Sequence, residues 1–75
     1  MTLDAALFET PVLITGFDRL SVSDLERLSA HGIDEGAIVI KIMRTPLQDP
    51  IECQVGPQLL ALDAWLLRRI MVSPQ

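Results

Sequence analysis

The sequence predicts a mainly β fold: a small, partly open β-barrel of about five strands, with one α-helix and a short helical turn before the last strand. The chain has 75 residues, so we expect one domain over residues 1–75. Its apolar stretches are short and closely spaced, and the chain is too small for a two-sheet sandwich. Closure into a barrel would also protect the edges that such apolar strands expose.

Composition narrows the function classes. Hydrophobic residues make up 49% of the chain and charged residues 21%, which favours a compact core over disorder. The formal net charge of −4 disfavours binding to nucleic acid or to an anionic membrane surface. A lone cysteine excludes an internal disulfide. No apolar run approaches the ~20 residues that span a bilayer, and the N-terminus lacks the basic region of a secretory signal, so we expect a soluble protein. The lone cysteine fits a reducing cytoplasm.

Apolar segments and the turn residues between them predict the positions of the strands. Residues 37–43, AIVIKIM, are apolar on both faces, which predicts a central strand. Pro46 and Pro50 cannot donate to a sheet, so residues 45–50 are expected to be a loop. In the first strand, Gly16 is a candidate bulge. The other predicted strands are residues 11–17, 51–55, 58–62 and 69–73.

The clearest helix is expected over residues 21–32, SVSDLERLSAHG. Ser21 is a candidate N-terminal cap, and Gly32 lies where a left-handed C-terminal cap favours glycine. Val22, Leu25 and Leu28 fall on one face at helical spacing. Residues 2–9 predict a short helical turn. A second short helix is expected within residues 62–70, where Asp63 near the start and Arg68 and Arg69 near the end suit the helix dipole.

Few residues could support catalysis or metal binding. Cys53 lies on the inward row of its strand and is expected to pack in the core, while His31 is expected to be a solvated helix-end residue. No zinc, nucleotide-binding or acyl-transfer motif occurs, which predicts a protein without catalytic residues or a cofactor. Carboxylates in or beside turns could meet Fe²⁺, although such residues are more often solvated. They are Asp34, Glu35, Asp49 and Glu52.

Trp65 is the only tryptophan. Tryptophan is enriched at interface hot spots, but it also closes barrel ends as a buried lid, and the sequence leaves both alternatives open. A groove for polyproline peptides needs several aromatic side chains, and the chain offers only Phe8 and Phe17 besides Trp65.

From residue 11 onward, the order of features resembles the FeoA family of ferrous-iron transport accessory proteins. The matching segments are TGF at 15–17, DLERLSAHGIDEG at 24–36, AIVIKIM at 37–43, TPLQDPIECQVG at 45–56 and LLALDAWLLRRIMV at 59–72. Two departures are His31, where the family usually has Leu, and Asp63, where it has Arg. Ala64 and Trp65 stand at or beside a Glu-Ala position of the family.

The resemblance implies an SH3-like β-barrel in the cytoplasm that supports ferrous iron uptake through FeoB, a membrane transporter with a cytoplasmic GTPase domain. It carries over no metal ligands. The leading hypothesis is a non-enzymatic module that docks on FeoB, with Leu47 and Gln48 of the stiff loop and Trp65 as partner-binding residues. The alternatives are direct Fe²⁺ binding or sensing, and a regulatory barrel that acts on a metal-dependent repressor or another protein. An apolar edge would also allow a homo-oligomer.

Overall fold

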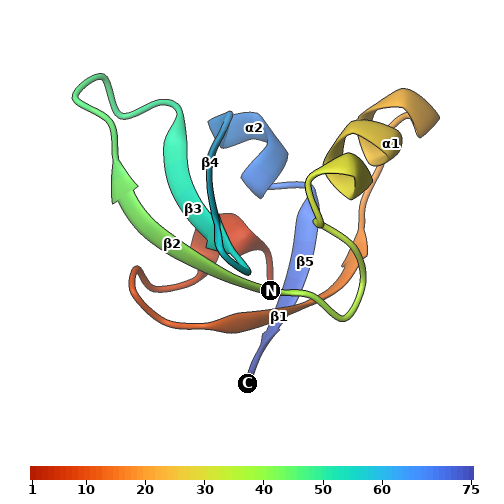
Figure 1. The fold of residues 1–75 in the computed structure, drawn as a ribbon, viewed down its shortest axis with the longest axis horizontal. Coiled ribbons are helices and arrows are strands. Elements are labelled where there is room, and N and C mark those ends of the chain that lie inside the picture. The colour runs from red at the N-terminus through yellow and green to blue at the C-terminus, as the bar shows by residue number, and fades with distance from the viewer.

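The computed structural model describes all residues from 1 to 75 (Figure 1). Five strands form one antiparallel sheet in the order β4-β3-β2-β1-β5. In chain order the elements are the 3₁₀ turn η1 (Leu3–Ala5), β1 (Val12–Phe17), α1 (Val22–Ala30), β2 (Ile38–Arg44), β3 (Ile51–Val55), β4 (Gln58–Leu62), α2 (Ala64–Leu67) and β5 (Ile70–Pro74). The predicted mainly β fold, with five strands and a short helix before the last, is confirmed.

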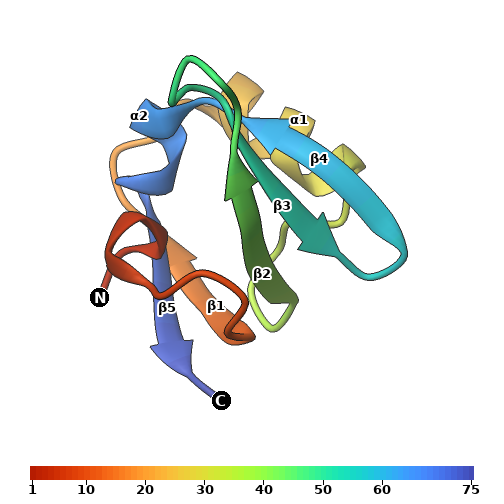
Figure 2. The same cartoon turned by 90° about the vertical axis from the view of Figure 1, so that its left-hand side faces the viewer.

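The helices α1 and α2 lie at one end of the curved sheet, together with the loop between β2 and β3 (Figures 1 and 2). The 3₁₀ turn η1 lies beside β5, where Thr2 forms an isolated bridge with Met71. None of the helical segments is both long and apolar enough to cross a membrane.

Strand β1 contains the bulge that the sequence predicts. Ile14 pairs with Val72 and Gly16 pairs with Met71, so β1 carries one residue more than β5 between these two pairs. An extra residue of this kind bends the strand and increases its twist, which helps a five-stranded sheet to curl around a core.

Strand β2 is central, as its apolar character predicts, and it brings a lysine into the interior. The side chain of Lys41 is only 2% exposed. Its Nζ donates a hydrogen bond to the carbonyl oxygen of Asp4 at 2.9 Å and lies 4.6 Å from the centre of the Phe8 ring. Burial lowers the pKa of Lys41 below its ordinary value. The lysine therefore fastens the N-terminal segment to the centre of the sheet.

The core collects apolar side chains from every strand, from η1 and from both helices. Cys53 packs within it as predicted, and burial raises the pKa of its thiol to about 11, so the thiol stays protonated at neutral pH. The core residues are Leu3, Ala6, Val12, Ile14, Leu28, Ile33, Val39, Ile51, Cys53, Val55, Leu62, Leu67, Ile70 and Val72.

Candidate protein-interaction site

Helix α1 has the predicted caps but packs only lightly on the rest of the molecule. The Ser21 hydroxyl accepts a hydrogen bond from the backbone N–H of Asp24 at 3.0 Å, and Gly32 after the helix has a φ of +82°. Of the three apolar residues predicted to share a face, only Leu28 is buried. Leu25 is half-buried and Val22 is 71% exposed, so the face that the three residues share is fully buried only at Leu28.

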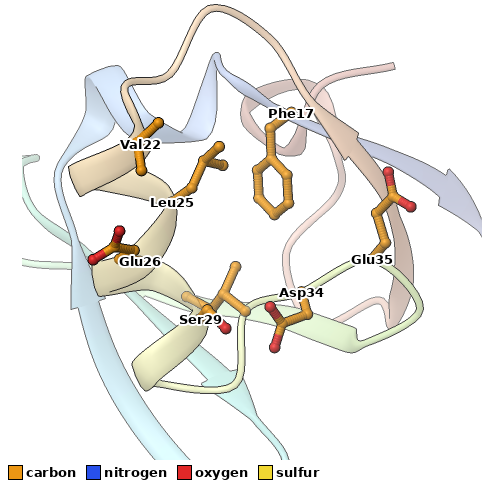
Figure 3. Close-up of a pocket in the computed structure, with 8 residues that line it drawn as sticks. Phe17, Val22, Leu25, Glu26, Ser29, Asp34 and Glu35 are labelled. Carbon is orange, nitrogen blue, oxygen red and sulfur yellow. The ribbon is translucent and has the colours of Figure 1, made fainter.

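Two open grooves follow the two sides of α1. We call the first the acidic groove; it is lined by Phe17, Val22, Leu25, Glu26, Ser29, Ile33, Asp34 and Glu35 (Figure 3). We call the second the Trp65 groove; it lies toward α2 and is lined by Asp24, Arg27, Leu28, His31, Leu62, Asp63, Trp65 and Leu66.

The helix supplies each groove with one stripe of side chains at the same helical spacing of i, i+3, i+4 and i+7. Residues 22, 25, 26 and 29 line the acidic groove, while residues 24, 27, 28 and 31 line the Trp65 groove. A short helix with one buried residue can therefore present two surfaces.

The Trp65 groove has a volume of about 210 Å³. The indole of Trp65 is 44% exposed, so it is neither a buried lid nor a free surface side chain. Asp24 and Arg27 form an ion pair on the α1 side of this groove. The Arg27 guanidinium, and then the Ser21 hydroxyl, lower the pKa of the Asp24 carboxyl below its ordinary value of 3.8 by hydrogen bonding. His31 lies at the end of α1, exposed as predicted.

The loop between β2 and β3 contacts the start of α2. The Asp49 carboxylate accepts a hydrogen bond from the backbone N–H of Ala64 at 2.9 Å. Asp63, which the sequence favoured near the helix start, makes no capping bond of this kind. Asp49 therefore caps the start of α2 from a distant part of the chain, a role that no local sequence pattern indicates.

This bond brings together two predicted contact regions. Leu47 is 87% exposed in the loop, and Gln48 is exposed with a φ of +70°. Because Asp49 follows Gln48 and Ala64 precedes Trp65, the loop and the start of α2 are neighbours at the helical end of the sheet (Figure 2).

The candidate metal-binding residues are dispersed. Asp34 and Glu35 line the acidic groove, His31 lines the Trp65 groove, and Asp49 caps α2. Glu52 is half-buried on β3, between the buried Ile51 and Cys53. No three His, Cys, Asp or Glu side chains come together in a group that could hold a metal ion.

These features define a small SH3-like β-domain that has two grooves beside α1 and exposes the apolar side chains of Val22, Leu47 and Trp65 at its helical end. The chain belongs to the FeoA family, because the FeoA domain model matches residues 1–74. The resemblance that the sequence suggested is thus confirmed. No curated protein sequence matches the chain.

Solved structures agree with this assignment. The iron(II) transport protein A of Clostridium thermocellum is 26% identical, with a TM-score of 0.88 over 99% of this chain and 45% of that chain. FeoA of Stenotrophomonas maltophilia, described as an SH3 domain protein complexed with zinc, is 26% identical, with a TM-score of 0.79 over 97% of this chain and 89% of that chain. The predicted SH3-like fold is therefore confirmed.

FeoA of Chlorobium tepidum has a TM-score of 0.89 at 24% identity, over 99% of this chain and 70% of that chain; at this identity the likeness concerns the fold alone. The chain spans less than half the length of the C. thermocellum protein and most of the length of the other two.

Proposed function

We propose that this chain is a non-enzymatic accessory protein of bacterial ferrous iron uptake. In this proposal it docks in the cytoplasm on the GTPase-bearing part of a FeoB-type transporter and modulates transport or GTP hydrolysis. Membership of the FeoA family carries the proposal. The S. maltophilia relative is described as a candidate activating factor of ferrous iron transport, which agrees with an accessory role.

The contact surface we propose consists of the Trp65 groove and the adjoining loop with Leu47 and Gln48. Trp65 combines a large apolar ring with partial exposure, which suits an interface anchor. Leu47 projects an almost fully exposed apolar side chain from a loop with prolines on both sides. Such a loop loses little conformational entropy on binding. The Asp49–Ala64 hydrogen bond holds this loop against the helix that carries Trp65.

Direct metal binding is the competing role, and a relative has been described as complexed with zinc. Here no three acidic, imidazole or thiol side chains lie close enough together to hold a metal ion, which favours docking over metal carriage. An anaerobic calorimetric titration with Fe²⁺ separates the two. Binding in the micromolar range by the isolated chain would support the metal role, and millimolar or weaker binding would remove it.

The docking role is tested by calorimetric titration of the chain with the cytoplasmic GTPase domain of its transporter. We expect Trp65→Ala and Leu47→Ala each to weaken binding about tenfold or more, as for anchors at an interface. The matched control is Leu59→Ala, which truncates a leucine that is 65% exposed on β4 and does not line the Trp65 groove. This control should bind like the wild type.

The fold of each variant is checked by its amide NMR spectrum. Because Trp65 is the only tryptophan, 5-fluorotryptophan labelling gives one ¹⁹F signal that reports occupancy of the Trp65 groove. Folded Trp65→Ala and Leu47→Ala proteins that bind at wild-type strength would rule out this surface. Absence of binding by the wild-type chain would rule out the docking itself.

A further inference from the structure

The acidic groove combines an apolar floor with a negative rim. Phe17 and Leu25 point into it from β1 and α1 (Figure 3), and the buried Ile33 also lines it. Three carboxylates stand around this floor, those of Glu26, Asp34 and Glu35. The groove has a volume of about 430 Å³, which falls within the roughly 300–1,000 Å³ typical of ligand pockets.

The three carboxylates have no cationic partner within the chain. The two ion pairs of the structure are Asp18–Arg19 and Asp24–Arg27, and neither includes a carboxylate of the groove. No lysine or arginine lines the groove, and the whole chain has a net charge of −4. The groove therefore presents uncompensated negative charge beside an apolar surface.

We propose that the acidic groove docks a basic amphipathic segment of a protein partner. An apolar anchor of that segment packs on Phe17 and Leu25, while its lysines or arginines meet Glu26, Asp34 and Glu35. The apolar floor of the groove calls for an apolar anchor in the segment, and the carboxylates of the rim call for positive charges on both sides of that anchor. Val22 extends the apolar surface along α1, since most of its side chain is exposed. An anionic membrane surface would instead be repelled.

This proposal does not rest on the function proposed above, because the acidic groove lies on the other side of α1 from Trp65. A partner on the transporter could occupy either groove, both or neither. The ¹⁹F signal of 5-fluorotryptophan distinguishes the cases, since occupancy of the acidic groove alone should leave the Trp65 signal in place.

The test uses the full chain, labelled with ¹⁵N, and three synthetic helical peptides of one design. The first has a leucine anchor stripe flanked by lysines, the second replaces the lysines by glutamates, and the third replaces the leucines by serines. We expect the first to shift the amide signals of Phe17, Leu25 and Asp34, with an affinity that falls as salt is added. The other two peptides should bind far more weakly.

Matched variants assign the effect to the groove. Glu26→Gln, Asp34→Asn and Glu35→Gln together should weaken binding of the lysine peptide about tenfold or more. All three residues are exposed, so the variant should fold. The control carries Glu9→Gln, Glu52→Gln and Asp63→Asn, which removes the same charge outside the acidic groove and should reduce binding only slightly. Val22→Ser should also weaken binding, whereas Leu59→Ser should not.

Equal binding of the lysine and glutamate peptides would overturn the proposal. So would unchanged affinity of the groove variant, or an equal loss in the control variant, because net charge alone would then explain binding. Amide shifts confined to residues outside the acidic groove would overturn it as well.

Discussion

The two grooves are lined by the same helix, but they differ in charge and in the apolar side chains that line them. The acidic groove has three carboxylates without cations around Phe17 and Leu25. In the Trp65 groove, Arg27 pairs with Asp24, so Asp63 is the one carboxylate left without a cation, and an indole forms part of the wall. The first surface should therefore attract partners by long-range charge, with strong salt dependence, and the second mainly by apolar contact.

Light packing of α1 makes this arrangement possible. The core of this 75-residue chain is small, and α1 contributes only Leu28 to it. The side chains on both flanks of Leu28 are left free to line grooves. In a larger domain the same two stripes would be covered by neighbouring elements.

The largest expected effect therefore comes from Leu28→Ala, which removes the anchor between the grooves. Truncation of a buried leucine costs about 2–5 kcal/mol in the free energy of unfolding, and this small domain has little stability in reserve. We expect α1 to detach and binding to both grooves to fail together. Urea denaturation measures the loss of stability, and amide hydrogen exchange locates it in α1.

Leu25→Ala is the comparison variant for this prediction. Leu25 is half-buried on the acidic flank, so its truncation should cost less and should affect only the acidic groove. A loss below about 1 kcal/mol for Leu28→Ala would mean that contacts other than this core anchor hold the helix.

A smaller and more local effect is expected for Asp49→Ala, which removes the acceptor for the Ala64 N–H. Loss of a helix cap costs about 1 kcal/mol, measured by urea denaturation. The change should shift the ¹⁹F signal of Trp65 and leave the amide signals of the acidic groove in place. Asp49→Asn keeps an acceptor oxygen and should retain most of the stability. If Asp49→Ala disturbs both grooves alike, they are not independent.

The features that the sequence predicted correctly depend on local patterns. The five strands follow short apolar segments bounded by turn residues, and the bulge follows from Gly16 in an apolar run. The features it could not predict join distant parts of the chain, such as the bond of Lys41 to Asp4 and that of Asp49 to Ala64. The grooves belong to this second kind, because the depth at which α1 sits is set by packing and not by its own apolar pattern.

The smallest expected effect concerns the ion pair that sets the charge of the Trp65 groove. Because Arg27 and Ser21 lower the pKa of Asp24 in the folded chain, the ionised carboxylate stabilises the fold above its ordinary pKa of 3.8. That contribution is lost as the pH falls through the lowered value. A ¹³C carboxyl titration should place the midpoint of Asp24 below 3.8, and Arg27→Met should raise it. Asp34→Asn, in the acidic groove, should leave it nearly unchanged. If the titration midpoint of Asp24 stays the same in Arg27→Met, the ion pair does not neutralise the Asp24 carboxylate. The contrast in charge between the two sides of α1 would then be smaller than the geometry indicates.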